Sequence, residues 1–147
     1  MKVAILSGSV YGTAEEVARH AQQLLVVDLN AESLQHLSST FGVSTAQQID
    51  LRLAEMDVIV FAVKPQQMQA VVKAVQPFVR DQLLLSVAAG IRASDMARWL
   101  GGYQKIVRAM PNTPAMIGQG MSGLFALDAV SEHEKNAAQA IMQAVGQ

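Results

Sequence analysis

Short apolar runs alternate along the chain with segments in which apolar residues recur every three or four positions. The first pattern is typical of buried strands and the second of amphipathic helices packed on one side. The apolar runs predict strands over residues 3–7, 25–28, 57–63, 83–87, 105–110 and 122–126. The periodic segments predict helices over residues 13–22, 31–41, 66–75, 93–100 and 131–145, with a short helical piece over 45–54.

Several of these boundaries have a chemical cause that can be read from single residues. Ser131, followed three residues later by Glu134, has the spacing of a capping box and predicts a helix start. Gly42 and the Gly101-Gly102 pair follow helical patterns, where a left-handed residue ends a helix. Pro65 suits a first helical position, because it lacks an N–H that would need a partner.

Alternation of strands and helices predicts βαβ units with right-handed crossovers. The expected fold is therefore α/β: a doubly wound, mostly parallel sheet with helices on both faces, in three layers. No repeat, low-complexity tract or linker divides the chain, so we expect a single domain over residues 1–147. Hydrophobic residues make up 51% and charged residues 16%. A sheet covered on both faces and a domain that has lost a partner surface both explain this apolar balance.

Charge and cysteine content exclude several classes of function. The net charge is −1 without a basic run, so neither nucleic acid nor an anionic membrane is an expected partner. The chain has no cysteine and its three histidines are widely spaced, so we expect neither disulfides nor a metal site. No apolar run reaches the ~18 residues of a membrane span, and no signal peptide is evident. We therefore expect a cytoplasmic protein.

The loop after the first strand has the composition of a phosphate site. Glycine and hydroxyl residues between a strand and a helix present backbone N–H groups and the positive end of the helix dipole to an anion. A tight turn with Thr13 as an ordinary N-cap is the alternative. The candidate residues are Gly8, Ser9, Val10, Tyr11, Gly12 and Thr13.

This loop resembles the phosphate loop of the flavodoxin-like family, which reads much like G-S-x-x-G-T-A-E-E. Residues 8–16 carry that pattern, and the resemblance covers roughly residues 1–24. It implies a site for flavin mononucleotide (FMN). The aromatic residues that sandwich the flavin ring in that family have no evident counterparts here, so we expect FMN binding to be weak.

From about residue 26 onward the chain resembles a different family, pyrroline-5-carboxylate reductase. That family reduces pyrroline-5-carboxylate to proline with NADPH or NADH, and builds a Rossmann domain followed by a helical, dimerising domain. The resemblance implies a Rossmann-type cofactor domain over residues 26–147, with the helical domain absent. It is carried by Val-Asp-Leu-Asn at 27–30, Ala-Val-Lys-Pro-Gln at 62–66, Ser-Val-Ala-Ala-Gly at 86–90, Trp-Leu-Gly at 99–101, Val-Arg-Ala-Met-Pro-Asn-Thr-Pro at 107–114, Gly-Met-Ser-Gly-Leu at 120–124 and Ala-Val-Gly at 144–146.

Two of these segments suggest contacts to the adenosine half of a dinucleotide. Asp28 ends the second strand, where a carboxylate can accept hydrogen bonds from ribose hydroxyls, and Asn30 could bind a 2′-phosphate. An N-cap role for Asp28 is the alternative. The Ala62-Val63-Lys64-Pro65 segment follows an apolar strand at the carboxyl edge of the sheet, where ligands bind in doubly wound folds. A plain surface lysine is the other interpretation of Lys64.

Two further segments suggest the nicotinamide half. The small residues Ala88, Ala89 and Gly90 at the end of the next strand would let a flat ring approach, unless they form an ordinary turn. The proline-bracketed loop at Met110, Pro111, Asn112 and Thr113 could contact substrate or nicotinamide, or be a stiff structural turn. NADP or NAD is thus the expected cofactor, with weak affinity. We assign no catalytic residue.

Two departures from the reductase family lead to a specific hypothesis. The first loop lacks the family's glycine fingerprint, and the chain stops where the helical domain would start. Together they suggest an engineered chimera of a flavodoxin-like unit over residues 1–24 and a truncated reductase domain, inactive for want of a complete active site. A natural recombinant, an active NAD(P)H-dependent reductase completed by a partner chain, and an FMN carrier are the alternatives. We expect some self-association, through exposed apolar surface or an exchanged N-terminal unit.

Overall fold

The computed structural model describes residues 2–7, 23–28, 31–88, 90–110 and 123–146. Its strands are β1 (Lys2–Ser7), β2 (Gln23–Val27), β3 (Ser44–Ala46), β4 (Val58–Ala62), β5 (Leu83–Ser86), β6 (Ile106–Met110) and β7 (Gly123–Ala126). Its helices are α2 (Ala31–Phe41), α3 (Pro65–Val75), α4 (Ala93–Trp99) and α5 (Glu132–Gly146), with short 3₁₀ turns η1 (Leu51–Glu55) and η2 (Gln76–Phe78).

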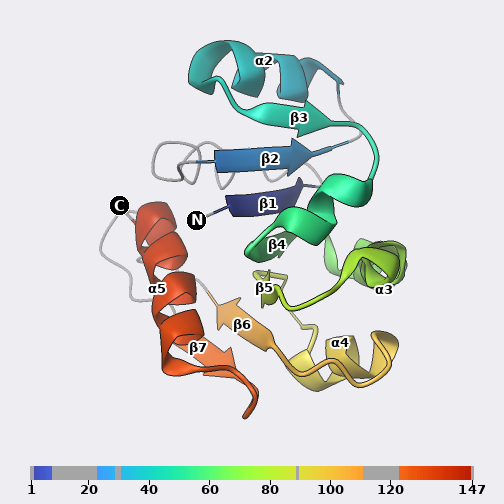
Figure 1. Cartoon of the computed structure of the whole chain (residues 1–147), viewed down its shortest axis with the longest axis vertical. Helices are drawn as coiled ribbons and strands as arrows, with labels where there is room; N and C mark the ends of the chain where they lie inside the picture. The colour runs from blue at the N-terminus through green and yellow to red at the C-terminus, as the bar shows by residue number, and fades with distance from the viewer. Residues whose placement is uncertain (1, 8–22, 29–30, 89, 111–122, 147) are drawn as a thin grey trace.

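The described strands form one seven-stranded sheet in the order β3-β2-β1-β4-β5-β6-β7. The pairs from β3 to β6 are parallel, and β7 runs antiparallel to β6. Figure 1 shows the sheet extending along the molecule, with α5 on one side and α3 and α4 on the other. This arrangement confirms the predicted doubly wound α/β fold, with its order reversing between β1 and β4.

Two apolar cores, one on each face of the sheet, hold the layers together. Successive strand residues point to opposite faces, so Val3 and Ile5 enter one core while Ala4 and Leu6 enter the other. Almost every residue of the central strands is buried, because both faces are covered. The first core is closed by Leu34 of α2 and by Ala138 and Ile141 of α5; the second is closed by Leu53 of η1, Met68, Val72 and Val75 of α3, and Ala93, Met96 and Ala97 of α4.

The chemically motivated boundaries are confirmed. The Ser131 hydroxyl accepts a hydrogen bond from the Glu134 N–H at 3.1 Å, and a Glu134 carboxylate oxygen accepts one from the Ser131 N–H at 2.9 Å. Gly42 and Gly101 have φ angles of 68° and 74°, which a side chain would disfavour, and each follows a helix. Pro65 is the first residue of α3.

The predicted helical piece over residues 45–54 is wrong in its first part. Ser44, Thr45 and Ala46 instead form β3, which pairs in parallel with β2 at the edge of the sheet. Only Leu51–Glu55 is helical, as a 3₁₀ turn that Asp50 caps by accepting a hydrogen bond from the Arg52 N–H. The second strand also starts at Gln23, two residues earlier than expected. The expected helix over residues 13–22 lies outside the described residues.

Among the described residues, none of the helices combines the length and apolar character needed to cross a membrane.

Candidate functional site

The carboxyl ends of β1, β2, β4, β5 and β6 meet at one edge of the sheet, because these strands are parallel. Ser7, the last residue of β1, is paired with Ala62, the last residue of β4. The strand order reverses between these two strands. In doubly wound folds, the crevice at such a reversal is where ligands bind. This edge is therefore the candidate site.

Asp28 lies at this edge, directly after β2. Its N–H donates to the carbonyl oxygen of Ala46, the last residue of β3, at 3.1 Å. Its exposed fraction is 9%, which is low for an acidic residue. The structure thus brings a carboxylate to the strand end where a ribose is expected to bind, as the sequence predicted.

The segment after β4 combines buried small residues with an exposed cation. Ala62 and Val63 are buried, whereas Lys64 is exposed with extended backbone angles. The Pro65 that follows begins α3, so Lys64 stands at the N-terminal end of that helix. Lys64 therefore lies two residues after the end of β4, which pairs with β1 at the strand reversal.

The end of β5 presents small residues to the same edge. The Val87 N–H donates to the Phe61 carbonyl oxygen at 3.1 Å and continues the strand pairing by one residue. The hydroxyl of the fully buried Ser86 accepts a hydrogen bond from the Ala88 N–H at 3.2 Å. Ala88 is buried and Gly90 is exposed with a φ of 78°. The turn is therefore fixed by a side chain that the sequence analysis did not single out.

The structure brings Asp28, the Ala62–Pro65 segment, Ala88, Gly90 and Met110 to one edge. Met110 is the last residue of β6. The other candidate residues lie outside the described part of the chain, and their predicted roles stay predictions. These are Gly8, Ser9, Val10, Tyr11, Gly12, Thr13, Asn30, Ala89, Pro111, Asn112 and Thr113.

Arg108 is a site candidate that the sequence analysis missed. It lies in β6 between Ser86 of β5 and Phe125 of β7, on the side of the sheet that α4 covers. Its Nε is buried and has no hydrogen-bond partner among the residues that the structure describes. A charged residue inside an otherwise apolar strand was the signal in the sequence, because charged groups are rarely buried without a partner.

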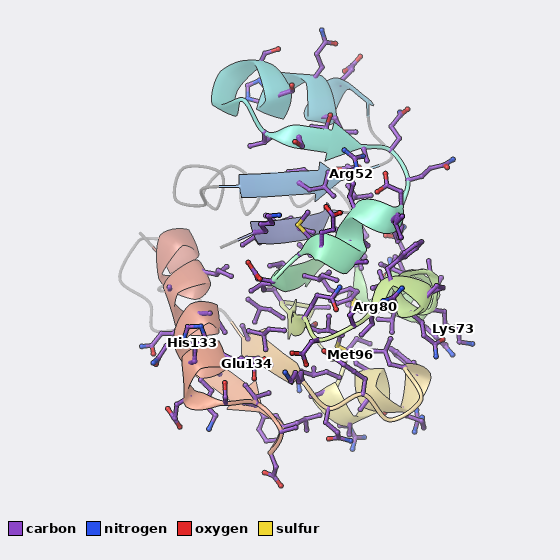
Figure 2. The ribbon with its side chains drawn as sticks, in the orientation of Figure 1. Arg52, Lys73, Arg80, Met96, His133 and Glu134 are labelled. Atoms are coloured by element: carbon purple, nitrogen blue, oxygen red, sulfur yellow. The ribbon has the colours of Figure 1, made fainter. Side chains whose placement is uncertain are left out.

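A hollow of about 740 Å³ lies at the opposite edge, where β4 and β5 begin. Val58 and Leu83, the first residues of those strands, form part of its lining, together with Arg80 and Glu134. Figure 2 shows His133 and Glu134 on the first turn of α5, across the molecule from Lys73 on α3. A position at the amino ends of the strands does not match the ligand edge of this fold.

Ion pairs and a partly buried phenol lie near this hollow. The Lys105 ammonium lies 2.6 Å from an Asp81 carboxylate oxygen and 3.5 Å from one of Glu134. The hydrogen bond to Asp81 is the main reason that the pKa of Lys105 is raised. Burial raises the pKa of Tyr103 to about 12. These groups connect α5, β6 and the start of β5, and so stabilise the fold away from the candidate site.

Known proteins that are similar to this chain include several pyrroline-5-carboxylate reductases. A pyrroline-5-carboxylate reductase from Pseudomonas aeruginosa is 36% identical over 142 residues, which is 96% of this chain and 52% of the relative. One from Vibrio alginolyticus is 43% identical over 75% of this chain and 41% of the relative. The structure of the Coxiella burnetii reductase matches with a TM-score of 0.85 and 31% identity, over 99% of this chain and 56% of that one. The chain thus spans about half the length of the curated relatives it matches.

A family model, described as NADP oxidoreductase coenzyme F420-dependent, matches residues 2–90. The match runs across residue 24, the expected junction of a chimera, and includes β1, β2 and the loop between them. The comparisons therefore give no support to a flavodoxin-like origin of the first unit. They do support a Rossmann-type domain similar to the N-terminal part of pyrroline-5-carboxylate reductases. The chain belongs to the family described as NADP oxidoreductase, coenzyme F420-dependent.

Proposed function

We propose that this chain is the nucleotide-binding part of an NAD(P)H-dependent reductase that acts on a cyclic imine such as pyrroline-5-carboxylate. The observation that supports this proposal most strongly is the composition of the carboxyl edge of the sheet at the β1–β4 reversal. A carboxylate lies at the end of β2, and small residues lie at the ends of β4 and β5. The names of the family and of its reductase relatives support the choice of cofactor and substrate.

The residues at this edge fit a nicotinamide dinucleotide. Asp28 would accept hydrogen bonds from the adenosine ribose, as acidic residues at this position do in doubly wound folds. Ala62 ends β4 and Ala88 lies two residues after β5, and their short, buried side chains would leave room for a flat ring to approach. The exposed Lys64 would add positive charge for an anionic group. When bound, the nicotinamide supplies the hydride that reduces the imine.

This chain's own contribution is to bind and orient the reactants. Residues on the ends of rigid strands hold their positions better than residues on loops, and accurate placement accounts for much of the rate gain in a transfer between two bound molecules. Asp28 is held by its backbone hydrogen bond to Ala46, and Ala88 by its bond to Ser86. These two bonds would keep the strand ends rigid and so help to place the reactants.

Calorimetric titration of the purified chain with NADPH, NADH and FMN tests the cofactor. We expect the chain to bind a nicotinamide nucleotide and not to bind FMN. We also expect Asp28→Asn to bind NADH more weakly than the control variant Asp128→Asn, which changes an exposed acidic residue after β7. Binding of FMN alone would contradict the proposal and support the flavodoxin-like hypothesis. Loss of NADPH absorbance in the presence of pyrroline-5-carboxylate tests the reaction. No turnover despite cofactor binding would support the prediction that the chain lacks a complete active site.

A further inference from the structure

The described residues at the carboxyl end of β2 bring negative charge to that part of the candidate edge. Asp28 follows β2 directly and is 9% exposed, and its N–H bond to the Ala46 carbonyl oxygen fixes the backbone that carries it. Glu32 lies in the first turn of α2, the helix that follows. An acidic residue in the first turn also offsets the positive end of the helix dipole, which would otherwise attract an anion. A ligand group that binds at this strand end therefore lies near two carboxylates.

Arg52, on the crossover that follows β3, is already held in an ion pair. Its Nε lies 3.1 Å from one Asp50 carboxylate oxygen, and its Nη2 lies 2.9 Å from the other. The hydrogen bond from Arg52 lowers the pKa of Asp50, so both groups stay charged and their charges cancel.

The same guanidinium makes a contact with β3 on the side away from β2. Its Nη2 donates to the Thr45 carbonyl oxygen at 3.5 Å. Successive carbonyl groups of a strand point to opposite sides, and that of Ala46 points to β2, where it accepts from the Asp28 N–H. The Thr45 carbonyl group therefore points away from β2. Arg52 is thus neutralised by Asp50 and is directed away from the strand end that carries Asp28.

Lys64 and His36 do not balance the carboxylates at the end of β2 either. Lys64 follows β4, which is two strands from β2 and so about 10 Å away at the usual strand spacing. β4 is the neighbour of β1, whose following loop binds the phosphates that NADH and NADPH share in this fold. His36 lies further along α2 than Glu32, and an imidazole is mostly neutral at about pH 8. The described residues around the end of β2 thus supply no permanent positive charge beyond the one that Asp50 neutralises.

NADH and NADPH differ only at the 2′ position of the adenosine ribose, which binds at the end of β2 in this fold. In NADH this position is a hydroxyl, which can donate a hydrogen bond to a carboxylate. In NADPH it is a phosphate with a charge of about −2, which an arginine binds in this fold and a carboxylate repels. We propose that Asp28 makes this chain select NADH over NADPH, although the description of its family names NADP. This rests on the proposed function, because it takes the ligand to be a nicotinamide dinucleotide.

Asn30, the sequence-based candidate for a 2′-phosphate contact, lies outside the described residues. A carboxamide donates hydrogen bonds but carries no charge, so it would not offset the repulsion between a phosphate and Asp28. Aspartate and asparagine have nearly the same shape. Asp28→Asn therefore removes the charge and retains one acceptor oxygen, which isolates the charge as the cause of selection.

Calorimetric titrations of the full chain with NADH and with NADPH, at physiological ionic strength and about pH 8, test the selection. We expect the parent chain to bind NADH roughly tenfold or more tightly than NADPH, as one unfavourable contact between like charges would produce. Asp28→Asn should reduce this ratio by roughly tenfold, through weaker binding of NADH and tighter binding of NADPH. AMP and adenosine 2′,5′-bisphosphate, which differ only by the 2′-phosphate, should show the same preference without any contribution from the nicotinamide.

Two control variants separate the role of Asp28 from a general effect of charge. Asp128→Asn, at an exposed position after β7, and Arg52→Gln should each keep the ratio of the two affinities within about twofold of the parent. If circular dichroism reveals that Asp28→Asn does not fold, Asp28→Ser provides the same comparison.

The outcomes distinguish this inference from the proposed function. Equal or tighter binding of NADPH by the parent chain would overturn the selection and leave the proposed function standing, whereas no binding of either cofactor would overturn both. An unchanged ratio in a folded Asp28 variant would remove Asp28 as the cause. A selective loss of NADPH binding in Arg52→Gln would reassign the 2′ position to Arg52 and would also overturn the proposal.

Discussion

Gln82 is a buried polar residue whose replacement should destabilise the fold strongly. Its side chain is 3% exposed and joins three backbone segments. The amide nitrogen donates to the carbonyl oxygens of Leu53 and Phe78 at 2.8 and 2.9 Å, and the amide oxygen accepts from the Arg80 N–H. In Gln82→Met, a change of similar size, all three bonds are lost. The carbonyl of Leu53 keeps its bond from the Met56 N–H, so two groups lose their partner among the described residues.

The size of the effect follows from those two groups. An unsatisfied buried group costs about 1–3 kcal/mol, and both groups are only partly buried, so we expect a loss of about 2–4 kcal/mol in the free energy of unfolding. With a urea dependence of roughly 2 kcal/mol per molar, the midpoint should fall by about 1–2 M. The transition can be followed by circular dichroism and by the fluorescence of the single tryptophan, Trp99.

Two further variants separate hydrogen bonding from volume. Gln69→Met makes the same exchange at an exposed position of α3 and should change stability by less than about 0.5 kcal/mol. Gln82→Glu preserves the shape and the acceptor for the Arg80 N–H but not the donors to Leu53 and Phe78, so it should also destabilise. The reasoning would be refuted if Gln82→Met unfolded at the same urea concentration as Gln69→Met.

Four further predictions concern separate parts of the molecule. Ser131→Ala should lower the free energy of unfolding, measured in urea, by about 1 kcal/mol, because α5 loses its cap. Ser39→Ala, at an exposed position of α2, should not lower it. The raised pKa of Tyr103 means that its stabilisation is complete below the unfolded value of about 10 and is lost as pH rises towards 12. Tyr103→Phe should therefore remove the phenol that titrates near pH 12 in absorbance and reduce the alkaline loss of stability. Lys64→Gln should weaken NADPH binding in calorimetry by roughly threefold to tenfold, since it removes a partly screened charge, whereas Lys73→Gln in the last turn of α3 should not. Phe125→Ser should reduce self-association in sedimentation, and a parent chain that is monomeric at every concentration would contradict that expectation.

The sequence was sufficient to predict the elements that have their own local cause. The parallel strands β1, β2, β4, β5 and β6 are mainly apolar. The capping box at Ser131 and the glycine at position 42 place helix ends without reference to the rest of the fold. The sequence also predicted that Asp28, Lys64 and Ala88 lie at one edge of the sheet. Each follows a predicted parallel strand, and parallel strands bring their carboxyl ends together.

The features that could not be predicted depend on distant contacts. β3 has only three residues and no apolar run, and it is a strand because the edge of β2 offers hydrogen bonds. Gln82 stands between Asp81 and Leu83 and has the character of a surface residue. It is buried because the carbonyl groups of two 3₁₀ turns require a donor. Arg108 stands out in the sequence as a charged residue in an apolar strand, but the burial of its Nε depends on the neighbouring elements.

The central position of β1 has a consequence for the synthesis of this protein. β1 needs a partner strand on each side, and the two partners follow it along the chain at very different distances, so they are synthesised at different times. Val3 pairs with Leu24 on one side and with Val58 on the other, so the second side stays open until more than fifty further residues have been added. During that interval a strand whose four central residues are apolar has an exposed edge, which favours pairing with other chains. Early collapse of the nascent chain therefore carries a risk of association with other chains, even though the finished sheet buries the four central residues of β1.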